Sequence, residues 1–281
     1  MKKNNDKSLK KIFDELDIKP KKHLGQNFLH DLNIIKAIVK VANVENENII
    51  EIGPGPGNLT ELMIKQKPKT IFAIEKDRSF RKRLEDIKIN NIKLFKYKID
   101  DVLNYDFTKL EKKNYKIVSN LPYNISVPFI SYMIKFQNTI KWKDMTLMVQ
   151  KEVADRILAD TGTKNYGRLS LMVSLKNHVT KIMNVNPTCF FPRPKVDSTV
   201  LKIIPKKDIY NLNQEIFEKI VKICFSQRRK TIKNNLDQLN IDTRLLLKQS
   251  KIDASMRPEN IDLEGFCRLS INYKKIFKAH F

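Results

Sequence analysis

Cysteine, histidine and glycine are scarce in this sequence, and long apolar runs are missing. The chain of 281 residues has three cysteines, which are far apart and odd in number, so they form neither a disulfide framework nor a paired metal motif. The four histidines are scattered as well. No apolar stretch approaches the roughly 20 residues of a membrane span, and no signal peptide follows the charged start. We therefore predict a cytoplasmic protein with no membrane association and no structural metal.

Acidic residues are also in the minority, with 31 Asp and Glu against 54 Lys and Arg, which gives a net charge of +23. Such an excess favours a polyanionic partner, of which nucleic acid is the commonest. The alternative is compositional, because abundant Lys, Asn and Ile are also produced by an AT-rich genome. The hydrophobic share of 41% is enough for one large domain and a smaller one.

The most informative stretch is K-I-V-S-N-L-P-Y-N-I-S, residues 116–126. It reads as a buried strand that ends in a turn at Asn120. Pro122 restricts Leu121 to an extended backbone and so fixes the direction of its carbonyl, while the Asn120 amide adds a second acceptor. Two acceptors beside the Tyr123 ring suit an amino group on a flat heterocycle, such as N6 of adenine, because they localise the lone pair of its nitrogen. An ordinary strand-to-loop turn is the alternative.

A predicted strand at 48–52 runs into E-I-G-P-G-P-G-N-L-T and then into a helix, which is the opening unit of a Rossmann-like fold. The spacing departs from the dinucleotide fingerprint, which would require glycine at Asn58. Pro54 and Pro56 lack N–H groups, so the turn is poorly suited to a pyrophosphate. S-adenosylmethionine therefore fits better than NAD.

Acidic residues follow the next two predicted strands, at 70–74 and around 92–97. Glu75 stands roughly 20 residues after Gly53, where a carboxylate can bind both ribose hydroxyls and would repel the 2′-phosphate of NADP. Asp100 and Asp101 follow the third strand, and either can accept from the adenine amino group of the cofactor. Ligands of open α/β sheets bind outside the carboxyl ends of the strands, so these acids and Asn120 should face one crevice.

The stretch C-F-F-P-R-P-K-V-D-S-T-V, residues 189–200, predicts a stiff loop that leads into a strand. We expect one of Phe190 and Phe191 to anchor the core and the other to supply a stacking face opposite Tyr123.

The pattern changes to helices alone near residue 208. We predict a Rossmann-like methyltransferase domain at 1–207, with a basic lead segment at 1–20, and a helical RNA-docking domain at 208–281. The densest basic cluster of the second domain is Arg228, Arg229 and Lys230, for which a solvated helix face is the alternative.

Together these residues resemble the KsgA-type small-subunit rRNA adenine N6-dimethyltransferases. The matches occur in family order over nearly the whole chain: L-G-Q-N-F-L (24–29), E-I-G-P-G-x-G-x-L-T (51–60), Glu75, Asp101, N-L-P-Y-N-I-S (120–126), F-F-P-R-P-K-V-D-S (190–198) and R-R-K at 228–230. The family more often has Gly-Asp where this chain has Asp100-Asp101, so the register of the adenine contact stays open by one residue.

The resemblance implies a Rossmann-like α/β fold with a small C-terminal all-helical domain. It implies that S-adenosylmethionine is bound, and S-adenosylhomocysteine released, by Asn27, Leu29, Gly53, Gly55, Glu75, Asp101 and Asn120, without a metal. The target adenine would be held by Asn120, Leu121, Pro122 and Tyr123, with Phe190 stacked on it.

By the same resemblance, a monomer would transfer four methyl groups to two adjacent adenosines near the 3′ end of 16S rRNA, in the small ribosomal subunit. We expect Arg228, Arg229 and Lys230 to hold the rRNA backbone, with Lys21 and Lys22 as the alternative docking point.

Two other functions are considered. A large-subunit rRNA methyltransferase of the erythromycin-resistance type is disfavoured by Gly25 before Gln26 and by Asp197. A non-catalytic RNA-binding assembly or transcription factor on the same fold would not need both the Asn120 motif and the glycine turn.

Overall fold

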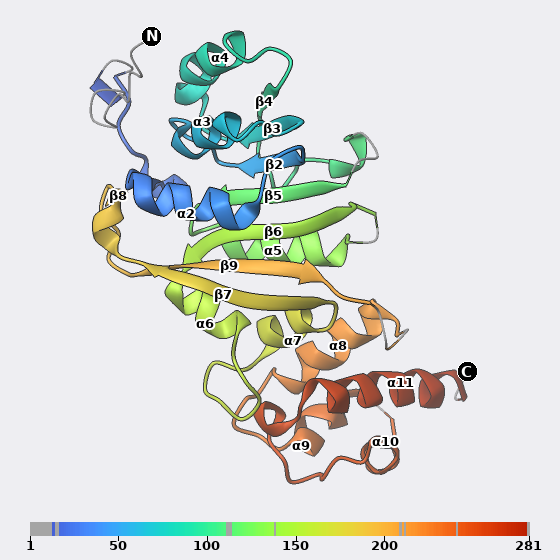
Figure 1. Cartoon of the computed structure of the whole chain (residues 1–281). Helices are drawn as coiled ribbons and strands as arrows, with labels where there is room; N and C mark the ends of the chain where they lie inside the picture. The colour runs from blue at the N-terminus through green and yellow to red at the C-terminus, as the bar shows by residue number, and fades with distance from the viewer. Residues whose placement is uncertain are drawn as a thin grey trace. The chain divides into compact units, whose positions relative to one another are not determined.

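The computed structural model describes residues 13–14, 17–110, 114–137, 139–207, 210, 212–239 and 241–279 (Figure 1). The chain divides into two compact units, Met1–Ala154 with Thr180–Ile204 and Asp155–Val179 with Pro205–Phe281. The second unit thus takes in residues 155–179, which the sequence pattern placed in the first domain. The functional division at residue 207 stays a prediction, and most of the basic lead segment lies outside the described residues.

The fold is organised around a mostly parallel sheet in which seven strands are described, in the order β4-β3-β2-β5-β6-β9-β7. Their bounds are β2 (Asn48–Ile52), β3 (Thr70–Glu75), β4 (Phe95–Ile99), β5 (Tyr115–Asn120), β6 (Trp142–Gln150), β7 (Asn177–Val185) and β9 (Ser198–Pro205). The pairs β2–β3, β3–β4, β2–β5 and β5–β6 are parallel, and β6–β9 is antiparallel. The chain order reverses between β2 and β5, the kind of switch point at which α/β sheets bind ligands.

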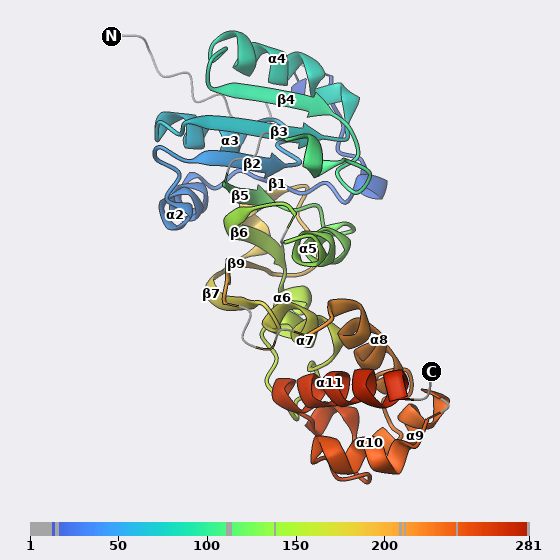
Figure 2. The ribbon, with the colours of Figure 1, turned by 90° about the vertical axis from the view of Figure 1, so that its right-hand side faces the viewer.

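Helices cover both faces of this sheet (Figures 1 and 2). They are α2 (Leu32–Ala42), α3 (Asn58–Lys65), α4 (Arg81–Ile89) and α5 (Ser126–Lys135). A two-stranded sheet, β1 (Phe28–Leu29) with β8 (Phe190–Phe191), lies apart from the main sheet. Short 3₁₀ turns complete the connections: η1 (Lys22–Leu24), η2 (Arg78–Phe80), η3 (Phe107–Lys109), η4 (Pro187–Cys189), η5 (Asp237–Leu239) and η6 (Pro258–Asn260). The Rossmann-like fold expected from the strand, glycine turn and helix is confirmed.

Helix α2 shows how the sequence sets these elements. Its N-cap Asp31 accepts from the amides of Asn33 and Ile34 at 2.8 and 3.2 Å. Its buried residues follow helical spacing and pack on the sheet: Ile35, Ile38, Val39 and Ala42.

The C-terminal end of α2 is held by a buried lysine of β5. Lys116 Nζ donates to the carbonyl oxygens of Ala42 and Asn43, each at 2.9 Å. These are carbonyls that the helix itself leaves unsatisfied, and a cation at this end also favours the helix dipole. Lys116 therefore fixes α2 to the strand that ends in Asn120.

Most strands and helices lie within a few residues of the predicted positions, but β4 and β7 differ. The third strand was expected at 92–97 and begins only at Phe95, because the amides of Leu94 and Phe95 both bond to the Asn91 carbonyl in a turn. Strand β7 was missed, since its side chains are largely polar and only its first and last residues are buried. Such a strand gives no apolar alternation to read.

The second unit is helical. It contains the C-terminal end of α6 (Lys151–Ile157), from Asp155 onward, and α7 (Arg168–Ser174), α8 (Gln214–Cys224), α9 (Ile232–Leu236), α10 (Thr243–Ser250) and α11 (Leu263–Ala279). Its own hydrophobic core includes Phe217, Ile220, Leu246 and Phe266. The predicted C-terminal helices are confirmed, and α10 and α11 extend beyond the expected apolar positions.

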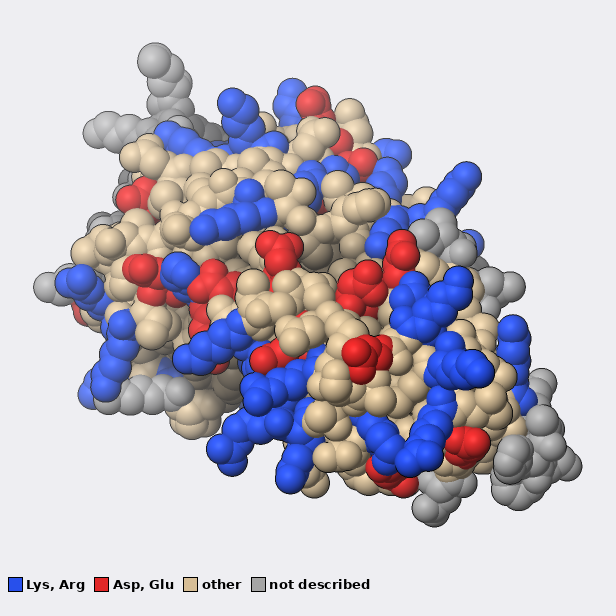
Figure 3. Space-filling view, turned by 90° about the horizontal axis from the view of Figure 1, so that it is seen from below, with Lys and Arg blue, Asp and Glu red and all other residues tan. Residues whose placement is uncertain are grey.

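Basic side chains outnumber acidic ones in this chain. Lys and Arg cover more of the face seen in Figure 3 than Asp and Glu do, as the net charge of +23 requires. No helix of the described ranges is both long and apolar enough to pass through a membrane. Among the same residues, no group of three or more His, Cys, Asp or Glu could hold a metal ion.

Candidate active site

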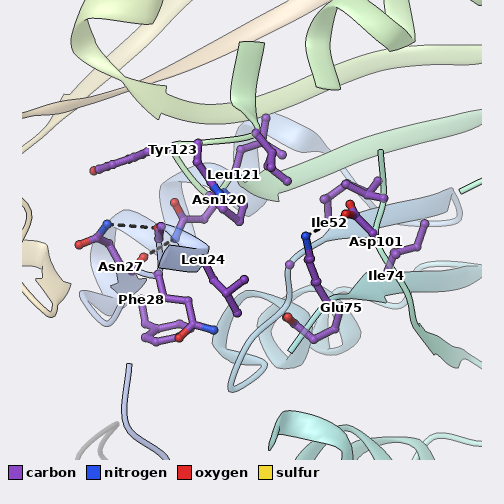
Figure 4. Close-up of a pocket in the computed structure, with 18 of the residues that line it drawn as sticks. Leu24, Asn27, Phe28, Ile52, Ile74, Glu75, Asp101, Asn120, Leu121 and Tyr123 are labelled. Atoms are coloured by element: carbon purple, nitrogen blue, oxygen red, sulfur yellow. Dashed lines mark hydrogen bonds and ion pairs between the residues drawn. The ribbon is translucent and has the colours of Figure 1, made fainter. Parts of the chain in front are cut away.

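A pocket opens beyond the carboxyl ends of β2, β3 and β5 (Figure 4). Gly53, Glu75, Asp101 and Asn120, which were expected to share one crevice, all line it. The other lining residues are Leu24, Gly25, Gln26, Asn27, Phe28, Ile52, Ile74, Lys76, Asp100, Val102, Leu121, Pro122, Tyr123, Asn124 and Ile125. Leu29, Gly55 and Phe190, also predicted as site residues, stand outside this set.

Asn120 is the last residue of β5, and its amide is held in one orientation. Asn120 Nδ2 donates to the carbonyl oxygen of Asn27 at 3.0 Å, as the dashed line in Figure 4 shows. Its Oδ1 accepts no hydrogen bond from the described residues, and neither does the carbonyl of Leu121. Two acceptors are thus left open where β5 ends, while the Leu121 amide is held by the Met148 carbonyl at 3.1 Å.

The Tyr123 ring is fixed through its hydroxyl. Tyr123 Oη and Ser198 Oγ lie 2.7 Å apart, and burial raises the pKa of this phenol. Ser198 is the first residue of β9, so this contact connects the Asn120–Tyr123 loop to a second strand of the main sheet besides β5. Pro122 packs beside the glycine turn, because a Cβ added to Gly53 would meet its ring at 3.4 Å.

Residues 21–28, here called the N-terminal strap, form one wall of the pocket. Gly25 has φ +66°, and a Cβ there would meet Asn124 Oδ1 at 2.8 Å and the Tyr123 amide nitrogen at 3.3 Å. Only glycine allows the strap to approach the Asn120 loop this closely. The strap therefore completes the pocket with Asn27 and Phe28.

A buried carboxylate holds the strap in place. Asp77 Oδ1 accepts from Lys21 Nζ at 2.6 Å, and Asp77 Oδ2 accepts from Gln26 Nε2 at 2.7 Å. The Asp77 side chain has 0% exposure and that of Lys21 40%. Burial alone would raise the pKa of Asp77, but the hydrogen bonds from Lys21, Ser79 and Gln26 outweigh it and lower the pKa to about 2. Lys21, Gln26 and Asp77 are called the Asp77 cluster below.

Glu75 lies at the end of β3 and faces the pocket. Its Oε2 accepts from the Gly55 amide at 2.9 Å and its Oε1 from the Asp77 amide at 2.7 Å. Burial nevertheless raises the pKa of Glu75 to about 7. Each carboxylate oxygen keeps a second lone pair, which leaves it able to accept from a ligand hydroxyl.

A second buried acid supports the glycine turn from behind. Thr60 Oγ1 donates to Glu51 Oε2 at 2.6 Å, which connects β2 to α3 across the turn. Burial raises the pKa of Glu51 to about 8, although the Thr60 hydrogen bond works in the opposite direction.

Asp100 and Asp101 both line the pocket, so the one-residue ambiguity stays open. Asp101 Oδ2 accepts from Lys76 Nζ and Asp100 Oδ2 pairs with Lys98 Nζ, each at 2.8 Å. These cations lower the pKa of both carboxyls.

Phe190 and Phe191 differ sharply in environment. Phe190 is 3% exposed and packs in the core of the first unit, whereas Phe191 is 47% exposed. Leu29, opposite Phe190 in the β1–β8 pair, is buried as well, and its carbonyl accepts from Asn58 Nδ2 at 3.0 Å. One of the two rings is thus buried in the core, and the expected stacking face opposite Tyr123, assigned to Phe190 by the resemblance, stays a prediction.

The basic residues predicted to hold RNA differ in their contacts with the rest of the chain. Arg228 Nε donates to Glu259 Oε2 at 2.8 Å, and its Nη2 donates to the carbonyls of Tyr166 at 3.0 Å and Thr163 at 3.4 Å. These four residues are called the Arg228 cluster below. Arg229 and Lys230 are exposed, and Lys22 lies in η1.

Sequence reasoning missed Asp77 and Ser198 as parts of the site. Two features of the sequence could have drawn attention to these residues. Asp77 lies two residues after Glu75, and Ser198 is the last residue of the F-F-P-R-P-K-V-D-S match. Neither gives a reason to expect contact with the strap or with Tyr123, because both contacts join segments far apart in sequence.

A parallel sheet with a glycine turn after one strand, an acid after the next and Asn-Leu-Pro-Tyr after another defines a Rossmann-like methyltransferase. The model of the ribosomal RNA adenine dimethylase family matches residues 5–275 of this chain. The chain belongs to that family, whose members depend on S-adenosylmethionine.

Comparisons with individual proteins agree with this family assignment. The ribosomal RNA small subunit methyltransferase A of Pelagibacter ubique is 38% identical over 92% of this chain and 98% of its own length. A crystal structure of a dimethyladenosine transferase from Plasmodium falciparum matches with a TM-score of 0.78 at 27% identity, covering 89% of this chain and 98% of that one. The 23S rRNA methyltransferase ErmE matches with a TM-score of 0.67 over 88% of this chain and all of its own, but at 21% identity it supports the fold alone.

Proposed function

We propose that this protein transfers methyl groups from S-adenosylmethionine to N6 of two adjacent adenosines in the 3′-terminal hairpin of small-subunit rRNA. The products are dimethyladenosines and S-adenosylhomocysteine. The observation that carries the proposal is the pair of open acceptors, Asn120 Oδ1 and Leu121 O, at the edge of the pocket. Membership of the dimethylase family supports the substrate class.

The residues of the pocket fit S-adenosylmethionine. Gly53 presents backbone without a side chain, Pro54 and Pro56 remove amides that a pyrophosphate would need, and the Glu75 carboxylate keeps lone pairs for ribose hydroxyls. We assign cofactor binding to Asn27, Leu29, Gly53, Gly55, Glu75, Asp101 and Asn120. When bound, the cofactor supplies a methyl group on a cationic sulfonium.

The chain's own contribution is to position an amine. In the first transfer Asn120 Oδ1 and Leu121 O accept the two N6 hydrogens, which draws the nitrogen toward a tetrahedral shape and localises its lone pair. In the second transfer one N6 hydrogen is left to be accepted, and each transfer releases one proton. Positive charge that develops on N6 lies against two oxygen dipoles already in place. The hydrogen bond to Asn27 keeps the Asn120 amide from turning its NH₂ group toward the base.

Tyr123 would hold the base from one side, with its ring fixed by Ser198. The target must leave its stack to reach this pocket. Phe190 is the family's second stacking residue, although its side chain here is buried and does not line the pocket.

Docking of the small ribosomal subunit is assigned to the basic residues Arg228, Arg229 and Lys230, with Lys21 and Lys22 as the alternative. Phosphate contacts position an RNA without reading its sequence. We further propose a monomer that acts in the cytoplasm, where ribosomal subunits are assembled.

The test is methyl transfer by Asn120→Ala. Unmethylated small-subunit particles are incubated with variant and cofactor, and dimethyladenosine is counted by mass spectrometry. The rate should fall about 10²- to 10³-fold, the usual effect of losing one preorganised hydrogen bond. Asn90→Ala, on an exposed helix end, is the matched control.

Near wild-type turnover by Asn120→Ala would remove Asn120 from the mechanism. Large-subunit particles are assayed in parallel. Methylation of those particles in place of the small-subunit ones would contradict the proposed substrate.

A further inference from the structure

Phe191 is an exposed aromatic residue on the strand that pairs with β1, whose Phe28 lines the pocket. Its side chain is 47% exposed, although large apolar side chains usually pack inside. It belongs to β8, where it lies opposite Phe28 of β1. The ring rests against Phe13, with centroids 5.7 Å apart and planes 46° apart. Phe191 thus stays exposed although one neighbouring ring contacts it.

The segment 190–198 is attached at both ends to residues that hold the Asn120 loop. At its start, β8 pairs with β1, directly after Asn27, whose carbonyl fixes the Asn120 amide at 3.0 Å. At its end, Ser198 is bonded to the Tyr123 hydroxyl at 2.7 Å. The exposed ring therefore stands on a segment anchored to the catalytic loop.

Two cations follow the ring on the same segment. Arg193 and Lys195 are both exposed, and Pro192 and Pro194 alternate with them and restrict the backbone. An aromatic face with cations nearby is the combination that binds single-stranded nucleic acid, because the base stacks on the ring and the cations meet the phosphates. The chemistry of the segment thus points to an unpaired nucleotide.

We propose that Phe191 is a stacking platform for the nucleotide beside the target adenosine, with Arg193 and Lys195 on its phosphates. The proposal rests on the proposed function, which supplies two adjacent adenosines as substrate. Taking one adenosine into the pocket removes the stacking partner of its neighbour. The Phe191 ring replaces that partner and keeps the second adenosine close to Asn120 while the first one reacts.

The experiment compares Phe191→Leu and Phe191→Tyr in methyl transfer to unmethylated small-subunit particles. Leucine keeps an apolar contact with Phe13 but has no π face, so KM for the particle should rise about 5- to 150-fold, the ratio equivalent to a stacking contact of roughly 1–3 kcal/mol. Tyrosine should behave as the wild type. The dissociation constant of S-adenosylmethionine should not change in either variant.

Ile92→Ala is the matched control, since Ile92 is 67% exposed in the same unit and lies on a different segment. Thermal unfolding of all variants checks that the fold survives. Replacing both Arg193 and Lys195 with Ala should reduce the salt slope of particle binding by about two units.

Equal KM values for wild type and Phe191→Leu would overturn the inference and make the ring an apolar cover. That result leaves the proposed function intact, because the wild type still methylates the particle. If instead the wild type transfers no methyl group to small-subunit particles, the proposed function fails, and this inference fails with it.

Discussion

The Asp77 cluster and the Arg228 cluster each tie a basic residue, predicted to hold RNA, to a carboxylate of the same chain. The ion pairs are similar in length, 2.6 Å for Lys21–Asp77 and 2.8 Å for Arg228–Glu259. The carboxylates differ in burial, with 0% exposure for the Asp77 side chain and 25% for that of Glu259. A cation on a buried carboxylate cannot leave without stranding a charge, whereas a partly exposed pair contributes less and can exchange. We infer that Lys21 serves the cofactor pocket and that Arg228 remains available to phosphate.

The sharpest test of this contrast is Asp77→Ala against Glu259→Ala. Loss of Asp77 frees the N-terminal strap, and if the strap is then in place only 1–10% of the time, the dissociation constant of S-adenosylmethionine rises about 10- to 100-fold. Glu259→Ala should leave it unchanged. Isothermal calorimetry measures both. Equal affinities in the two variants would mean that the strap does not depend on Asp77.

The second prediction concerns acid stability. The pKa of Asp77 is lowered to about 2 from the ordinary 3.8, so the unfolded chain binds more protons between these values. Stability from the Asp77 cluster is therefore present above pH 4 and is lost as the pH falls from about 4 to 2. Between pH 4 and pH 2, the free energy of unfolding of Asp77→Asn should therefore fall by up to about 2 kcal/mol less than that of the wild type. Denaturant unfolding across that pH range gives the measurement. If the variant and the wild type lose the same free energy of unfolding, the assigned pKa is contradicted.

The third prediction addresses RNA. Replacing Arg228 and Arg229 with Ala should weaken binding to small-subunit particles about tenfold and reduce its salt slope by about one unit per lost phosphate contact. Cofactor affinity should remain that of the wild type, which is the control. Particle binding over a salt series provides the slope. If the slope does not change, the cluster is a solvated face; docking at the alternative point, Lys21 and Lys22, would then also contradict the inference that Lys21 serves the pocket.

The smallest effect is expected from Glu259→Gln. The amide weakens the hold on Arg228, so RNA affinity should stay the same or rise by about two- to fivefold, as expected from an exposed pair worth less than about 1 kcal/mol. The same particle-binding assay detects it. A clear fall in affinity would show that Glu259 orients Arg228 for its task.

Much of the fold was predictable because parallel strands buried on both faces are continuous apolar runs. Strands β2, β3 and β5 were expected from such runs, and the acids and Asn120 at their ends line one pocket. Strand β7 was not predicted, because a polar edge strand has no apolar run. The two-residue pair β1–β8 was equally invisible, since pairing 160 residues apart depends on tertiary packing.

Within the site, residue types were easier to predict than their partners. Asn120 was identified from its own motif, but nothing in that motif says that Asn27 orients its amide. Lys21 was predicted as part of an alternative RNA docking point, and only the fold brings Asp77 to it. Sequence alone also could not say which of Phe190 and Phe191 is buried.

The buried Lys116 has a consequence for local opening. Strand β5 and residues 27–43 are tied together twice, by Asn120 to the Asn27 carbonyl at one end and by Lys116 to the Ala42 and Asn43 carbonyls at the other. The two segments are thus joined by hydrogen bonds at both ends, and neither can separate from the other while both sets of bonds hold. We expect the amides of α2 to exchange with deuterated water only through global unfolding and not by fraying. Lys116→Met would remove the hydrogen bonds to the Ala42 and Asn43 carbonyls, at the end remote from the pocket. The amides of α2 would then begin to exchange from its C-terminal turn.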